Sequence, residues 1–188
     1  MINRKIIVLA ALTAVTSFSP FFALAGGHGI MVGGAEMVAT KNIIENASES
    51  ADHTTLVAAV TAAELVELLQ GEGPFTVLAP TNAAFDALPE GTVDNLLKPE
   101  NIETLQAVLS CHVVAANAMA ADVIKMIADD GGEHTVGTAG GCMLVAKYND
   151  DKVTFTDENG NVATVTIADV AQKNGVIHVI DTVLLPKS

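Results

Sequence analysis

Apolar residues recur at helical spacing through much of the first half of the chain. The run IIENA at 43–47 follows Asn42 in this way, and a broad apolar stripe runs through LVAAVTAAELVELL at 56–69. We expect the stripe to form two helices, with a break near Thr61. Further helical patterns cover residues 92–97, 102–109 and 120–128.

Short runs rich in β-branched residues dominate the second half. They lie at 135–136, 142–146, 153–156, 162–167, 176–180 and 182–185, with glycine, asparagine and aspartate between them. The sequence DENG at 157–160 predicts a hairpin connection. Residues 75–79 and 111–114 add two earlier strands. This distribution predicts an α+β fold: a compact β-sandwich or wedge of short strands, with several helices on one side and most helices in the N-terminal half.

Two segments combine a strand pattern with turn or cap chemistry. In FTVLAPTNAAF at 75–85, Pro80 ends strand pairing, and Thr81 or Asn82 caps a helix whose Phe85 enters the core. In NGVIHVIDTVLLP at 174–186, the Asn-Gly pair forms a turn before alternating apolar positions. We interpret both segments as folding elements first.

These segments, with CHVV at 111–114 between them, resemble the fasciclin family in order and spacing. The first looks like its first homology box, CHVV like its central tyrosine-histidine motif, and the last like its second box. The resemblance covers about residues 38–186 and implies a fasciclin-like fold. The N-terminal signal pattern described below and the Ala-rich composition indicate a bacterial, secreted, single-domain member. The residues that the resemblance marks are Phe75, Thr81, Asn82, Phe85, His112, Asn174, Gly175, His178 and Asp181.

One departure from the family pattern concerns Cys111, which stands where the family usually has tyrosine. Integrin recognition, which is linked to that region in animal members, is therefore not expected here. Cys111 and Cys142 are the two cysteines of the chain, and export permits a disulfide between them. We expect His112 to hydrogen-bond Asn82 or Asp86. His178 has no ligand-spaced partner and is interpreted as a core or surface histidine.

The N-terminus has the pattern of a signal peptide over residues 1–25. Arg4 and Lys5 precede an apolar run, and Ala23-Leu24-Ala25 has the small-x-small form of a cleavage site. The alternative is a membrane anchor. Cleavage predicts a secreted or periplasmic protein without membrane insertion, in which a Gly-rich flexible arm at 26–37 precedes a domain at 38–186.

Charge and motifs exclude several classes of function. The formal net charge is −13, and cleavage removes two cations and no acidic residue, so the mature chain carries −15. Such a surface repels nucleic acid and anionic lipid. The sequence lacks a G-x-S-x-G elbow, an H-E-x-x-H motif, a P-loop and a dinucleotide fingerprint. We expect no enzyme but an adhesion or matrix-association domain, whose partner is a protein or a polysaccharide surface.

An alternative function rests on the predicted mature N-terminus, Gly26-Gly27-His28. A free α-amine, two backbone amides and an imidazole present four nitrogens in one plane, which suits Cu(II) or Ni(II). This would make the protein a periplasmic metal-handling accessory; a flexible tail with an accidental histidine is the simpler interpretation. We expect no other cofactor.

Overall fold

The computed structural model describes residues 29–187. The predicted signal peptide and Gly26, Gly27 and His28 lie outside these residues. The helices are α1 (Ile43–Glu49), η1 (Ala51–His53), α2 (Thr54–Ala62), α3 (Val66–Gln70), α4 (Asn82–Asp86), α5 (Thr92–Leu96), η2 (Pro99–Asn101), α6 (Ile102–Ser110) and α7 (Ala120–Asp129). The strands are β1 (Ile30–Val32), β2 (Ala35–Met37), β3 (Phe75–Pro80), β4 (Val113–Val114), β5 (Glu133–Gly137), β6 (Met143–Asn149), β7 (Lys152–Thr156), β8 (Val162–Gln172) and β9 (Gly175–Ile180).

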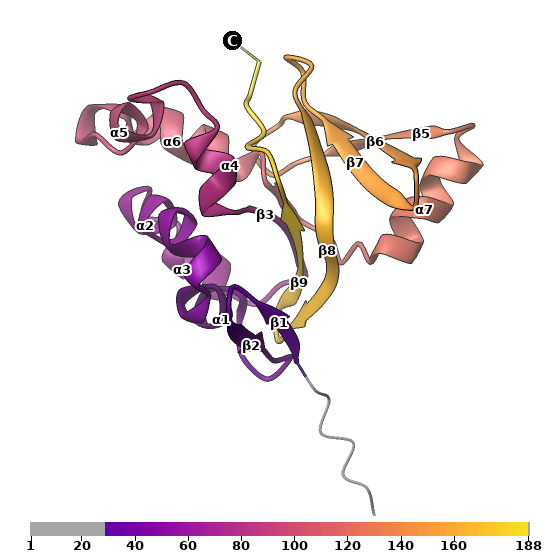
Figure 1. The fold of residues 1–188 in the computed structure, drawn as a ribbon, viewed down its shortest axis with the longest axis horizontal. Helices are drawn as coiled ribbons and strands as arrows, with labels where there is room; N and C mark the ends of the chain where they lie inside the picture. The colour runs from indigo at the N-terminus through magenta and orange to yellow at the C-terminus, as the bar shows by residue number, and fades with distance from the viewer. Residues whose placement is uncertain (1–28, 188) are drawn as a thin grey trace, which may run out of the picture.

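Seven strands form one sheet in the order β4-β3-β9-β8-β7-β6-β5. Only β3 and β9 pair in parallel, and all other neighbours are antiparallel. Register shifts between Val165 and Ile167 and between Ile167 and Val170 interrupt the pairing of β8 with β9. Such irregularities bend a strand. The long β8 therefore carries the sheet around a curve, and the two halves form a wedge (Figure 1).

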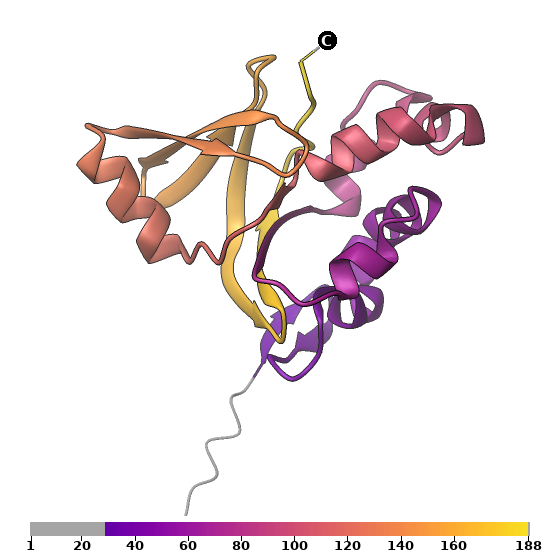
Figure 2. The same ribbon diagram turned by 180° about the vertical axis from the view of Figure 1, so that it is seen from behind.

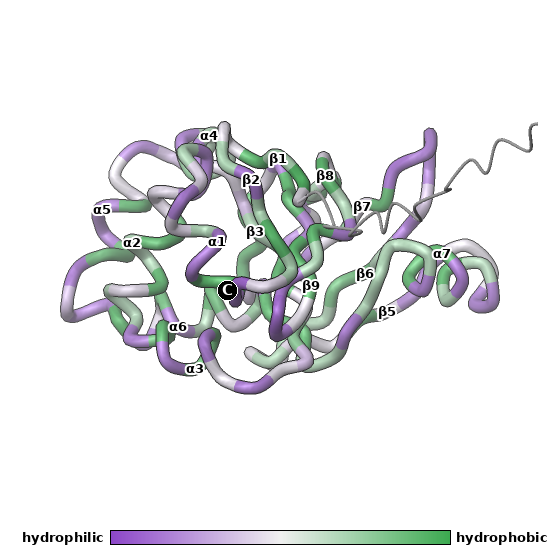
Figure 3. Tube along the Cα trace, turned by 90° about the horizontal axis from the view of Figure 1, so that it is seen from below, coloured by the Kyte–Doolittle hydropathy of each residue, from purple (hydrophilic) through white to green (hydrophobic). Residues whose placement is uncertain are grey.

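Two hydrophobic cores lie on opposite faces of the central strands. The larger core, which includes Phe85 and Ile177, lies between the sheet and helices α1–α6. The smaller core, which includes Leu78 and Ile180, lies between the two halves of the sheet under α7. Hydrophobic residues follow the inner strands while the outer loops are largely hydrophilic (Figure 3). Burial on both faces explains why β3 and β9 are largely apolar, with Thr76 and His178 as their buried polar residues.

These observations confirm the predicted α+β class and the concentration of helices in the N-terminal half. The apolar stripe at 56–69 forms α2 and α3, which separate at residues 63–65, close to the predicted break at Thr61. The DENG segment connects β7 to β8 as an antiparallel hairpin, as expected. Helix α7 differs from the others because it packs against β5 and β6 on the far side of the sheet (Figure 1).

The expectation of a flexible arm over residues 26–37 is wrong from Ile30 onward. Residues 30–37 form an antiparallel hairpin, β1–β2, whose Val32 and Met37 are buried. Gly33 and Gly34 supply the two positive φ angles, 57° and 78°, that a tight hairpin turn requires. The carbonyl of Gly33 accepts a hydrogen bond from Ala51 N (3.0 Å). The folded domain therefore begins near residue 30 and not at 38.

The strand expected at 182–185 is also absent. Residues 183–187 have no regular secondary structure and lie outside the ladder. Their backbone amides find side chains in place of a neighbouring strand: Leu184 N donates to His112 Nε2 (3.0 Å) and Leu185 N to Asp157 Oδ2 (2.9 Å). In contrast, β8 extends five residues beyond its predicted end at Ile167.

Candidate functional site at the junction of two distant sequence blocks

The two sequence blocks meet as neighbouring parallel strands. β3 from the first block pairs with β9 from the second, in a register that runs from Phe75 opposite Gly175 to Pro80 opposite Ile180. Phe85 and Ile177 belong to the same core, while Phe75 lies partly buried against it. The prediction that the blocks come together in space is thus confirmed.

The first block fastens α4 to the N-terminal helices. Thr81 is the N-cap of α4, and its Oγ1 accepts from Ala84 N (3.3 Å), as its position predicts. Asn82 has a different task. Its Oδ1 accepts from Thr55 N (3.0 Å), and its Nδ2 donates to Ala51 O (2.8 Å). One amide side chain therefore satisfies backbone groups where η1 passes into α2.

Asn174 ties the second block to two helices. Its Oδ1 accepts from Ile43 N (3.1 Å), and its Nδ2 donates to Leu69 O (2.8 Å) and Gly71 O (2.9 Å). These partners belong to the start of α1 and the end of α3. The asparagine is thus more than a turn former, because it satisfies free backbone groups at the ends of two helices.

His112 forms no hydrogen bond with Asn82 or Asp86, so that expectation is wrong. Its Nδ1 donates to Val108 O (2.8 Å), and its Nε2 accepts from Leu184 N (3.0 Å). The residue lies two positions after the end of α6, and its ring folds back onto the last turn of that helix. The two contacts assign the Nδ1–H tautomer. His112 therefore joins the end of α6 to the C-terminal segment.

Asp157 holds the same C-terminal segment from the other side. Its Oδ1 accepts from Asn159 N (2.9 Å) and Asn161 N (2.8 Å), while its Oδ2 accepts from Asn161 Nδ2 (2.8 Å) and Leu185 N (2.9 Å). Sequence reasoning missed this role. An aspartate that opens a hairpin loop signals the bonds within the loop, but no local signal points to Leu185.

His178 and Asp181 provide further hydrogen bonds between the second block and other parts of the domain. His178 Nε2 donates to Ala118 O (2.8 Å), and its Nδ1 accepts from Asp169 N (3.2 Å). Asp181 Oδ1 accepts from Thr164 N (2.8 Å) at the end of β9. His178 is buried with both ring nitrogens bonded, which agrees with its interpretation as a core histidine.

Cys111 and Cys142 form a disulfide, as expected, and their Cα atoms are 5.3 Å apart. Both residues are buried. The bond joins the end of α6 to the residue before β6. Beside it, Ala139 N donates to Val113 O (2.7 Å) and Gly140 N to Ser110 O (3.0 Å). Covalent and hydrogen bonds together therefore join the two ends of the curled sheet at this point.

Burial lowers the pKa of His112 from its ordinary 6.5 to about 4, although the Val108 carbonyl and Asp157 favour its charged form. Burial also lowers the pKa of His53 and His178. A depressed histidine pKa means that the folded state binds fewer protons than the unfolded chain, so stability is complete above pH 6.5 and falls as the pH approaches 4.

We therefore expect acid to destabilise the domain through His112. The loss between pH 6.5 and 4 should be on the order of 3 kcal/mol from this residue. Urea denaturation at several pH values measures it. His112→Gln should be less stable at pH 7, because the Leu184 contact is altered, yet its stability should change less between pH 7 and 4.5. An unchanged slope in His112→Gln would show that other groups carry the acid response.

Within residues 29–187, no group of three or more histidine, cysteine, aspartate or glutamate side chains is arranged to hold a metal ion. No helix in that range is both long and apolar enough to cross a bilayer.

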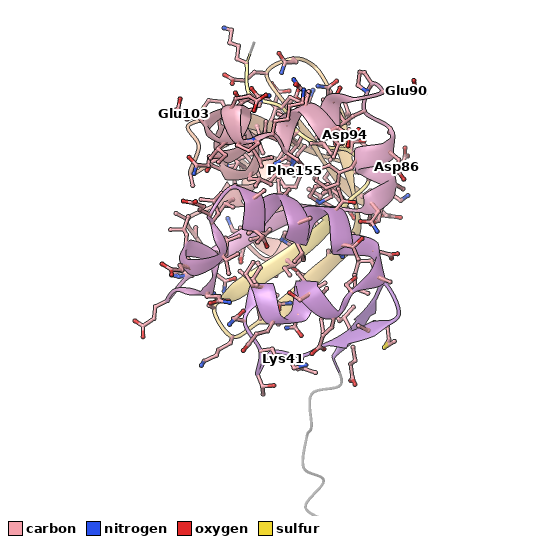
Figure 4. The ribbon with its side chains drawn as sticks, turned by 90° about the vertical axis from the view of Figure 1, so that its left-hand side faces the viewer. Lys41, Asp86, Glu90, Asp94, Glu103 and Phe155 are labelled. Atoms are coloured by element: carbon pink, nitrogen blue, oxygen red, sulfur yellow. A yellow bond between two sulfur atoms is a disulfide. The ribbon has the colours of Figure 1, made fainter. Side chains whose placement is uncertain are left out.

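Acidic side chains lie exposed on the helical face. Figure 4 shows Asp86, Glu90, Asp94 and Glu103 on its upper part, with Lys41 at its lower edge.

The Fasciclin domain model matches residues 51–186. This chain belongs to the fasciclin family. Its fasciclin domain thus includes β3, β9 and the disulfide, while the β1–β2 hairpin and α1 precede the matched residues.

Relatives of this fasciclin domain occur in several organisms. Protein sll1483 of Synechocystis is 45% identical over 185 residues, which are 95% of this chain and 96% of that protein. The cell surface glycolipoprotein MPB83 of Mycobacterium bovis is 35% identical over 122 residues, or 65% of this chain and 48% of that protein. A solved FAS1 domain pair from the insect cell adhesion molecule fasciclin I has a TM-score of 0.54 at 24% identity and covers 67% of this chain and 42% of that one. The last match shows a shared fold.

Proposed function

We propose that this chain is an exported, non-enzymatic fasciclin domain that associates with a cell surface or envelope matrix through its outer face. The observation that carries the proposal is the fasciclin domain itself, over residues 51–186. Its 35% identity to a cell surface glycolipoprotein supports a place at a surface. The predicted signal peptide over residues 1–25 supports export.

The buried polar side chains of His112, His178 and Asp157 bond within the protein, which supports a role without catalysis. The ring nitrogens of His112 and His178 all have backbone partners, and Asp157 accepts four hydrogen bonds. Side chains engaged in this way hold the fold together and leave no free acid, base or nucleophile among them. The partner we propose is a protein or a polysaccharide. Nucleic acid is not among the candidates, because the chain carries a formal charge of −13.

An adhesion assay tests this proposal. Beads coated with residues 26–188 should be retained on native envelope material severalfold more than beads coated with an unrelated acidic domain. Retention should be unchanged by EDTA or by added Cu(II), because surface contact requires no metal. His28→Ala is the matched variant and should be retained equally. Retention no greater than that of the unrelated domain would contradict the proposal.

The alternative function is copper or nickel handling at Gly26-Gly27-His28, favoured by the three-residue sequence that follows the predicted cleavage site. The same assay separates the two functions. Retention that requires Cu(II) and is lost in His28→Ala would favour metal handling.

A further inference from the structure

The sheet curls so that its two edge strands, β4 and β5, approach each other at one end only. Residues 139–142, which lie between β5 and β6, are bonded to the end of α6 and the start of β4 by the Ala139–Val113 and Gly140–Ser110 hydrogen bonds and the disulfide. Beyond these bonds, β5 and the segment 114–119 diverge. Helix α7, β5 and this segment form three sides of a triangle with β8 behind it (Figure 2).

A cavity of about 210 Å³ occupies this opening. Val114, Ala116 and Ala118 line one side, and β5 contributes Val136 on the other. Helix α7 supplies Val123 and Met126, while Leu78 and Phe155 lie on the remaining wall. Nearly all of the exposed wall is therefore hydrocarbon. Ordered water needs two to four polar partners, so such a lining favours an apolar occupant.

The two buried polar side chains of the wall, Thr76 and His178, have hydrogen-bond partners within the protein. Thr76 Oγ1 donates to Ala116 O (2.6 Å) and accepts from Ala118 N (2.8 Å). His178 bonds through both ring nitrogens to Ala118 O and Asp169 N. The hydroxyl hydrogen of Thr76 and both ring nitrogens of His178 are therefore already engaged. Burying a polar or charged ligand group here would cost free energy without compensation.

The rim adds a preference against anions. On β5, His134 Nδ1 is paired with Asp130 Oδ2 (2.6 Å), so an acidic side chain lies at this rim and already engages that ring nitrogen. The chain as a whole carries a formal charge of −13. A ligand carboxylate at this rim would meet like charge. The occupant should therefore be neutral as well as apolar.

We propose that this cavity binds an uncharged hydrocarbon group, such as a short alkyl chain or the apolar part of a larger neutral molecule. An engineered cavity of ~150 Å³ binds six-carbon benzene, so the volume here suits roughly eight carbons. This proposal goes beyond the adhesion function proposed above and does not depend on it. The ligand class follows from the wall chemistry and the rim charge together.

Titration of isotope-labelled residues 26–188 with 1-octanol and with octanoate, followed by NMR, tests the proposal. Octanol should give saturable shifts on Leu78, Val123, Val136 and Phe155, and octanoate at pH 7 should bind at least about tenfold more weakly. Shifts that do not saturate, shifts centred elsewhere, or equal binding of octanoate would each overturn the proposal.

A pair of phenylalanine variants tests the location. Val136→Phe places a larger side chain in the cavity and should abolish octanol binding. Val145→Phe is the matched control, because Val145 lies on the adjacent strand β6 and outside the cavity wall; it should bind like the wild type. Octanol binding that survives in folded Val136→Phe would overturn the assignment. If Val136→Phe does not fold, the shift map of the wild type decides alone.

Discussion

Replacing Gly175 with alanine should remove most of the stability of the domain, by more than about 4 kcal/mol. Gly175 opens β9 directly opposite Phe75 of β3. A Cβ atom added there would lie 2.0 Å from Phe75 O and 2.8 Å from Phe75 C. Both are backbone atoms of the neighbouring strand, so no side chain can turn aside to make room.

The strands have no easy way to relieve this clash. The chains are equally close just before this position, because a Cβ added to Gly73 would lie 1.9 Å from Asn174 O. Moving β9 away would also pull Asn174 from Leu69 and Gly71, whose carbonyls it satisfies. Since a domain of this size is stabilised by only about 5–15 kcal/mol in total, a largely unfolded variant is the expected result.

Circular dichroism and urea denaturation measure this effect, with Gly91→Ala as the control. Gly91 has a φ of 79° and no neighbour within 4 Å of an added Cβ, so alanine there should cost only about 1–2 kcal/mol from backbone conformation. A Gly175→Ala protein as stable as Gly91→Ala would contradict the close approach of the two blocks.

Removing the Cys111–Cys142 disulfide should destabilise the domain by about 4 kcal/mol. The bond closes a loop across a sequence separation of 31. In the chain-entropy model, the unfolded chain regains conformational entropy when a loop of this length is opened. Its free energy falls by about that amount, so the folded state becomes less stable relative to it. Urea denaturation of Cys111→Ala/Cys142→Ala, compared with the wild type, measures the difference.

Reduction provides an independent control for the same effect. A reducing agent should shift the wild-type unfolding midpoint to that of the double variant and leave the double variant unchanged. On reduction, amide hydrogen exchange should accelerate most at Ala139 and Gly140, whose amides bond to the segment that holds Cys111. Two reactive thiols in the unfolded, unreduced wild type would contradict the bond itself.

The errors in the sequence interpretation share a physical cause. The arm at 26–37 looked unstructured because its glycines break periodicity, yet two of them form a hairpin turn and the flanking Val32 and Met37 are buried. The segment 182–185 has a strand pattern, but its amides bond to His112 and Asp157. In both segments, contacts with residues far away in the sequence determine which structure forms, and the local pattern does not show those contacts.

By itself, the sequence determined the class of the fold, the positions of most helices and strands, a helix cap at Thr81 or Asn82, and the family of the domain. These features depend on periodicity and on turn and cap chemistry, which act over a few neighbouring residues. Only the tertiary structure decided the partners of the buried polar side chains. His112 binds an amide 72 residues away, and Asn174 reaches backbone more than a hundred residues away. The apolar cavity beside α7 likewise exists because the two edges of one curved sheet meet at one end and part at the other. No local pattern carries that information, because folding alone brings those atoms together.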